Sequence, residues 1–355
     1  MKRPRRLALC AAMGAAALLQ GCSASSYYWQ AFAGQMEVQR LSRPVDEVIA
    51  APDTASEIRR RLEYAKVARA FASSELHLPD NRSYKVYADL KRNYIVWNVF
   101  AAPAFSLKLE THCFPVAGCV NYRGYFSEAA ANAYADELRA RGLDVYSGGV
   151  PAYSTLGWFD DPLLNTFIRY PELEIARLIF HELGHQVAYA QGDSTFNESF
   201  ATTVEEEGLR RWMVAHASPE QKSQYEVFAG RRRALMALLR GAREKLLLAY
   251  EQPGSAADKA AAKQAVFVAM REEYAQLKAG WGGYAGYDAW IMKDLNNAKL
   301  GSIATYNQQV PAFNALLRRE NNDLPRFYAR VKELAELPKA ERNRRLDELA
   351  GASAS

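Results

Sequence analysis

The segment His181-Glu182-Leu183-Gly184-His185 constrains this chain more than any other feature of its sequence. On a helix, side chains four residues apart project from one face, so both imidazoles can reach one metal ion. Glu182 is turned about 100° around the helix axis from His181, where its carboxylate can reach a water molecule on the ion. Neutral imidazole suits Zn²⁺, and a catalytic zinc site keeps three protein ligands and a water molecule. The pattern predicts one zinc ion per chain, with Glu182 as general base.

The third ligand is expected on a second helix that follows a short turn. Gly192-Asp193-Ser194 interrupts the first helix, and Asn197-Glu198-Ser199-Phe200-Ala201 begins the next one. Because the turn reverses the chain, the first turn of the second helix can face the two histidines. We therefore predict Glu198 as the third ligand. Its rivals are Asp193, Glu205, Glu206 and Glu207.

The first 21 residues have the pattern of an export signal. Four basic residues precede an uncharged run, 7–19, that is too short to span a membrane as a helix. The run ends in Leu19-Gln20-Gly21-Cys22, which resembles a bacterial lipobox, so Cys22 is expected to carry a lipid after cleavage. The alternatives are an ordinary cleaved signal and an uncleaved anchor. Ser23 follows the cysteine, which by resemblance to lipoprotein sorting favours the outer membrane and a site facing the periplasm.

Charge and cysteine content are best assessed without this signal. Its removal takes the formal net charge from +5 to +1, and no Lys/Arg stripe with interleaved aromatics follows. A nucleic-acid partner is therefore not expected. Cys113 and Cys119 remain, separated by a loop with Pro115 and Gly118 that can bend, and an oxidising compartment favours a disulfide between them. Two free buried thiols are the alternative.

The pattern of apolar, β-branched and turn residues predicts an α+β chain that is predominantly helical. Residues 23–80 look helical, 127–142 form another helix, and extended segments are expected at 84–87, 94–100, 120–125 and 144–154. Further helices are expected at 171–190, 197–217, 221–250, 256–278, 287–299, 310–319, 324–337 and 339–349. These elements predict one domain, 22–355, with a strand-containing lobe at 23–165 and a helical lobe at 166–355.

The two metal-binding segments resemble the gluzincin pattern, in which a helical His-Glu-x-x-His precedes an Asn-Glu pair. The chain is more closely similar to the putative zinc aminopeptidase family of bacterial lipoproteins, through the segments 27–35, 113–126, 148–161 and 306–313. This resemblance implies a gluzincin-like metallopeptidase fold and a zinc hydrolase that acts on peptide or protein substrates at their N-termini. It assigns the metal to His181, His185 and Glu198, and the base role to Glu182.

The chain departs from the better-known gluzincins at several positions. Thr202 stands where they have an acidic residue that orients a histidine, so Glu205 is the candidate for that role. The oxyanion formed during hydrolysis needs a donor, for which Tyr153, Tyr306 and Arg123 are the candidates. An aminopeptidase also needs a carboxylate for the substrate amine. The nearest candidates for that carboxylate are Asp160, Asp161 and Glu172.

Three functions remain open at the level of sequence. The leading hypothesis is a lipid-anchored zinc aminopeptidase. The nearest alternative is an endopeptidase of the cell envelope. The third is a non-catalytic lipoprotein that keeps zinc and binds an envelope partner, although a purely structural zinc site has no use for the base Glu182.

Overall fold

The computed structural model describes residues 26–114 and 118–351 of the chain. The predicted export signal and Cys22 lie outside these residues. Helices hold 62% of the chain and the strands form only small sheets, which confirms the expected α+β class with helices predominating. Within the described residues, no helix combines the length and the apolar character that a membrane span requires.

The N-terminal part consists of three helices and a small sheet. A helix at 26–41 is followed by β1 (Arg43–Pro44), α2 (Val45–Ala50) and α3 (Ser56–Ser74). β1 pairs with β2 (Val86–Ala88), which in turn pairs with β8 (Leu163–Leu164). The continuous helical segment expected at 23–80 is therefore wrong in detail. Pro44 has an extended conformation and cannot donate a helical hydrogen bond, so the chain breaks there before α2 begins.

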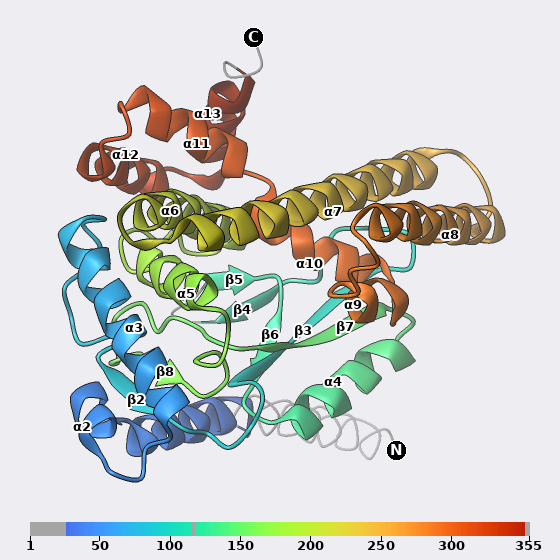
Figure 1. The fold of residues 1–355 in the computed structure, drawn as a ribbon. Helices are drawn as coiled ribbons and strands as arrows, with labels where there is room; N and C mark the ends of the chain where they lie inside the picture. The colour runs from blue at the N-terminus through green and yellow to red at the C-terminus, as the bar shows by residue number, and fades with distance from the viewer. Residues whose placement is uncertain (1–25, 115–117, 352–355) are drawn as a thin grey trace, which may run out of the picture.

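A second sheet lies in the middle of the molecule and has the order β6-β3-β7. The central strand β3 (Val96–Ala102) pairs antiparallel with β6 (Arg123–Tyr125) and with β7 (Asp144–Val150). α4 (Glu128–Ala140) covers one face, where Trp97, Val99 and Ala135 are buried together. The other face of the sheet is turned toward the helices that follow residue 171 (Figure 1).

A disulfide-linked hairpin lies between this sheet and the long helices. β4 (His112–Phe114) pairs with β5 (Gly118–Val120), and Cys113 and Cys119 face each other across the pair and are bonded. Gly118 has a φ of +73°, and a Cβ there would lie 2.6 Å from the backbone nitrogen of Gly192. Only glycine fits this close approach. The hairpin therefore rests on the turn between α5 and α6.

The remainder of the chain is helical. Its helices are α5 (Glu172–Gly184), α6 (Ser194–His216), α7 (Pro219–Glu251), α8 (Ala256–Gly280), α9 (Asp288–Met292), α10 (Asn297–Asn307), α11 (Val310–Arg319), α12 (Leu324–Glu336) and α13 (Lys339–Gly351). α7 and α8 form a long antiparallel pair (Figure 1). Ser218 and Ser255 each form a capping box at the start of one of these two helices, which explains why both begin so sharply.

Two of the expected helices have different limits. The helix expected at 171–190 ends at Gly184, because the amides of Gln186 and Val187 bond three residues back in a tightening last turn. The helix expected at 287–299 is two helices. The side chain of Asn296 accepts a hydrogen bond from the amide of Lys299 and so starts α10 anew.

The largest apolar cluster joins segments that are far apart in sequence. Leu62 of α3 and Phe180 of α5 are buried in it, together with Phe200 of α6, Phe313 of α11 and Phe327 of α12. Complete burial of a side chain of this size contributes roughly 1.5–3 kcal/mol. The core thus holds α5 and α6 between the N-terminal helices and the last three helices of the chain.

Candidate metal centre

The two segments with the predicted ligands lie on adjacent helices, α5 and α6. Gly184 is the small residue that permits their close approach, because a Cβ at this position would already touch Ala201 and Val204 at 3.4 Å. A larger side chain would push the helices apart. The glycine inside the His-Glu-x-x-His segment therefore lies where α5 and α6 are in close contact, with room for no more than a methyl group.

Polar side chains fix the turn between these helices. Asp193 accepts a hydrogen bond from the amide of Phe196 at 3.3 Å and so caps α6. The side-chain amide of Asn197 accepts a hydrogen bond from the backbone amide of Ala190 at 2.7 Å and donates one to its carbonyl oxygen at 3.0 Å. This pair of bonds ties the end of the turn to the first turn of α6. The next residue, Glu198, is thereby directed toward the histidines.

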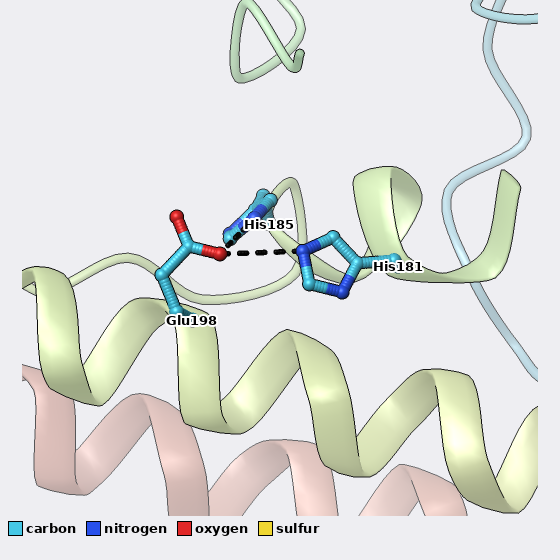
Figure 2. Close-up of side chains that lie close together, drawn as sticks. All are labelled: His181, His185 and Glu198. Carbon is cyan, nitrogen blue, oxygen red and sulfur yellow. Dashed lines mark hydrogen bonds and ion pairs between the residues drawn. The ribbon is translucent and has the colours of Figure 1, made fainter. Parts of the chain in front are cut away.

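His181, His185 and Glu198 converge on one point (Figure 2). Glu198 Oε2 lies 3.3 Å from His181 Nε2 and 3.5 Å from His185 Nε2, and the three donor atoms lie within 4.8 Å of one another. Two atoms that each bind zinc at about 2.1 Å with a tetrahedral angle are roughly 3.4 Å apart. The spacing and the nitrogen and oxygen donors therefore fit a zinc ion, with room for a fourth ligand.

The pKa values of this cluster show that it favours positive charge. Burial alone would lower the pKa of His181, but hydrogen bonds to Glu198 and Glu205 outweigh it and raise that pKa to about 10. Burial would raise the pKa of Glu198, but the two histidines lower it to about 2. The carboxylate is thus charged at neutral pH, and positive charge is favoured between these three side chains.

Glu205 contacts the far side of His181. Its Oε2 lies 2.8 Å from His181 Nδ1, and both its oxygens accept hydrogen bonds from Arg177 Nη1 at 2.9 Å. Burial opposes the charge on this carboxylate, but Arg177 and His181 hold its pKa well below the usual range. A charged carboxylate accepts the proton of Nδ1 and leaves Nε2 free for a metal.

The four alternative third ligands lie elsewhere in the structure. Asp193 pairs with Arg342 Nη2 at 2.8 Å, and Glu207 pairs with Arg210 and Arg211. Glu206 is exposed on α6. Glu205 reaches only the Nδ1 side of His181. Among the described residues, the group with the spacing of a metal site is His181, His185 and Glu198.

Glu182 lies beside this group at the wall of a cavity of about 640 Å³. Its side chain is buried, and this burial raises its pKa above the usual range, although His181 and His185 lower it. A raised pKa suits a group that must take up a proton and give it back. The cavity reaches both Glu182 and the donor atoms of the metal centre.

Two structural layers enclose the cavity. The sheet β6-β3-β7 lies on one side, where Val96, Asn98, Gly124 and Val150 line the cavity, and α5, α6 and α10 lie on the other. The walls are largely aromatic, formed by Tyr27, Phe114, Tyr122, Phe126, Tyr153, Tyr189 and Tyr306. Glu182, Glu198 and Glu205 are the carboxylates among the described residues that line it.

The candidate oxyanion donors have different surroundings. The hydroxyl of Tyr153 donates to Oε1 of Gln35, and the guanidinium of Arg123 stacks 4.1 Å from the ring of Tyr27. Tyr306 lies at the cavity, and burial together with the nearby Glu198 raises its pKa. Its hydroxyl has no hydrogen-bond partner in the described part of the chain. Arg123 does not line the cavity and the Tyr153 hydroxyl is bonded, so Tyr306 is the candidate with an unpaired donor at the cavity among the described residues.

The candidate acids for a substrate amine do not line the cavity. Asp160 pairs with Arg82 at the surface, and Glu172 lies 3.9 Å from Arg61. Asp161 is buried, but it accepts hydrogen bonds from the backbone amide of Thr155 and from the side-chain amide of Gln186. The structure therefore places none of these three carboxylates where it would meet an amine inside the cavity.

Sequence reasoning missed three residues of the site. Arg177 is one turn before His181 on the same face of α5, a signal that was readable from the spacing. Tyr122 lies at the cavity, and burial and Glu198 raise its pKa, but a single tyrosine among twenty carries no sequence signal. Asn98 was read only as part of a strand, although its amide lines the cavity.

Comparison with known proteins adds one finding. A family model described as Putative aminopeptidase (Aminopep) matches residues 26–346, which is most of the chain and includes the metal centre and the cavity. No curated protein and no solved structure matches the chain significantly. The chain therefore belongs to the Aminopep family of putative aminopeptidases.

Proposed function

We propose that this protein is a zinc-dependent peptidase of gluzincin-like architecture. The observation that carries the proposal is the placement of Glu182 at a cavity wall, next to the converging side chains of His181, His185 and Glu198. Three ligands with an open fourth position, and a base beside them, are the parts of a hydrolytic zinc site. Membership of a family of putative aminopeptidases supports the same reaction.

Each group in the site has a definite task in peptide hydrolysis. A bound zinc ion would supply a water molecule of lowered pKa and polarise the scissile carbonyl. Glu182 takes the proton from the attacking water and passes it to the nitrogen of the leaving amine. The hydroxyl of Tyr306 donates to the oxygen on which negative charge develops. The aromatic walls exclude bulk water and offer apolar surface to substrate side chains.

A purely structural zinc site is a weaker reading of the same residues. Structural sites close the fourth position with a further protein ligand. A buried Glu182 with a raised pKa would then serve no purpose and would only add the cost of burying a carboxyl group. The cavity at the metal centre is likewise of no use to such a site.

An endopeptidase remains the second candidate function. The carboxylates at the cavity are Glu182, Glu198 and Glu205, and each already has a partner or a role among the described residues. A substrate amine thus finds no spare carboxylate there. This arrangement favours recognition of peptides along their length, whereas the family description favours cleavage at the N-terminus.

We further propose that the protein works in the cell envelope, anchored by lipid at Cys22 and facing the periplasm. The proposal rests on the lipobox-like segment and on the bonded pair Cys113 and Cys119, which suits an oxidising compartment. Growth with a radioactive fatty acid tests it. The full-length chain is expected to take up label, and a Cys22→Ala variant is expected to take up none.

The decisive experiment compares Glu182→Gln with the wild type. The variant keeps the metal ligands, so one zinc per chain is expected in both proteins, measured by atomic emission. Its kcat on peptides is expected to fall by roughly 10²–10⁴ because the base is lost. Glu206→Gln, an exposed change on α6, is the matched control and should keep the full rate. Absence of bound zinc, or an unchanged rate in Glu182→Gln, would contradict the proposal.

A further inference from the structure

Asn98 is a buried amide that the fold leaves without a partner. It lies in the middle of β3, its side chain lines the cavity, and only 6% of the residue is exposed. In the described part of the chain no side-chain or backbone group hydrogen-bonds its amide. The amide is open to the cavity and is not sealed in the core, so it is available to a ligand there.

The neighbouring strand β6 leaves space beside this amide, whereas on the β7 side the ring of Tyr146 lies over Gly148. Asn98 is paired with Gly124 on β6 and with Gly148 on β7, and residues paired directly across a sheet share one face. Neither neighbour has a side chain that could bond the amide. A Cβ at Gly124 would lie only 3.0 Å from Asn98 Oδ1. The glycine therefore keeps the cavity side of Asn98 open.

The chemistry of the amide indicates what it binds. A carboxamide offers a donor and an acceptor side by side, which matches the N–H and C=O of a peptide backbone. The carboxamide carries no charge, so its ligand does not need a charged amine. The carboxylates of the cavity are held by other groups, as Glu205 is by Arg177 and His181. Asn98 is thus a neutral polar group on the sheet side of the cavity, opposite the helices that carry His181 and Glu198.

We propose that the side-chain amide of Asn98 binds a backbone peptide group of an extended substrate and so positions the chain in the cavity. The inference rests on the proposed peptidase function and names its substrate class. The ligand is a peptide that is recognised through its backbone, with or without a free N-terminal amine.

The test measures peptide binding in the absence of turnover. Protein with the Glu182→Gln change is titrated calorimetrically with an apolar tetrapeptide and with its N-acetylated form. Addition of Asn98→Ala is expected to raise Kd about three- to tenfold for both peptides, the range of one hydrogen bond. Ser147→Ala, on β7 and on the opposite face of the sheet, is the matched control and should leave both Kd values unchanged.

A second variant keeps the amide and closes the space above it. Gly124→Ala places a methyl group against Asn98 Oδ1, so the Kd of both peptides is expected to rise. Circular dichroism and thermal melting confirm that each variant is folded. Unchanged Kd values in both variants, or a loss confined to the peptide with a free amine, would overturn the inference.

Failure of this inference is distinguishable from failure of the proposed function. If Asn98→Ala binds both peptides as the parent does while wild-type protein hydrolyses them with bound zinc, the inference alone is wrong. If wild-type protein holds no zinc and hydrolyses no peptide, the peptidase proposal is wrong. In active protein, Asn98→Ala should raise KM by the same factor as Kd and leave kcat within about twofold.

Discussion

Glu205 Oε2 lies 2.8 Å from Nδ1 of His181, and Arg177 Nη1 lies 2.9 Å from both oxygens of the same carboxylate. This chain of contacts fixes the orientation of one imidazole from behind. No comparable partner holds Nδ1 of His185, which is buried without a hydrogen bond among the described residues. The two histidines of the candidate metal centre are therefore unequally supported.

Loss of this support should weaken metal binding. A Glu205→Gln change removes the charge that holds the proton on His181 Nδ1, and zinc affinity is expected to fall about 10- to 100-fold. Competition with a chromophoric chelator measures the affinity. Glu207→Gln serves as control, since Glu207 pairs with Arg210 and Arg211 away from the site. Equal zinc affinity in Glu205→Gln and wild type would show that the contact does not support the metal.

Loss of the Tyr306 hydroxyl should lower kcat and leave zinc binding unchanged. Its hydroxyl is the one among the sequence-predicted donors that is free at the cavity, so Tyr306→Phe should lower kcat by roughly 10²–10³. Zinc content should stay at one per chain. Tyr153→Phe is the matched control, because that hydroxyl donates to Gln35, and its kcat should change little. A larger loss in Tyr153→Phe than in Tyr306→Phe would reverse the assignment.

Deprotonation of Asp161 should lower the free energy of unfolding as the pH rises. Its burial raises its pKa from 3.8 to about 7, although hydrogen bonds from Thr155 lower it, and the nearby Glu182 adds to the rise. Between pH 4 and 7 the folded state holds a proton that the unfolded state has lost, so the free energy of unfolding falls over this window, by about 4 kcal/mol in total.

The variant Asp161→Asn removes that titration. Relative to wild type, its free energy of unfolding should rise steadily from pH 4 to pH 7 and then stay level, as followed by urea denaturation at each pH. An exposed acid such as Asp136, which is 74% exposed, gives the control Asp136→Asn with no such trend. A flat difference between Asp161→Asn and wild type would contradict the raised pKa.

The buried pair of Arg342 and Asp193 should be important for stability. Arg342 Nη2 lies 2.8 Å from Asp193 Oδ2, and the two residues are 3% and 1% exposed. Arg342→Met leaves the carboxylate buried, with only Lys339 nearby at 3.5 Å, so the expected loss is about 3 kcal/mol or more.

Two further variants make this prediction specific. Adding Asp193→Asn to Arg342→Met should recover part of the loss, because the unpaired charge disappears. Arg345→Met changes an exposed arginine of the same helix and should cost less than about 1 kcal/mol. Urea denaturation measures all of these proteins. A similar cost in Arg342→Met and Arg345→Met would refute the role of the pair.

The class of the fold and the convergence of His181, His185 and Glu198 were predictable from local sequence. Helical spacing places His181 and His185 on one face, and the turn at Gly192 requires the chain to reverse before Glu198. Glu205 was predictable as a partner of a histidine for the same reason, since it lies two turns after Glu198 on α6.

The remaining features depend on contacts between distant segments. The turn after α5 is held by Asn197, whose bonds to Ala190 form only after the chain has folded back. Whether a tyrosine hydroxyl is free depends on its neighbours, as Gln35 shows for Tyr153. The role of Asn98 likewise depends on its pairing with two glycines on other strands.

The ion pair of Arg342 and Asp193 also has a consequence during synthesis, because its two residues emerge at different times. Asp193 caps the helix that carries Glu198, and its buried partner lies 149 residues later, close to the end of the chain. Synthesis must therefore reach α13 before the charge of this capping carboxylate is paired with Arg342. In a chain that stops before α13, Asp193 would therefore have no arginine to offset its charge at the start of α6.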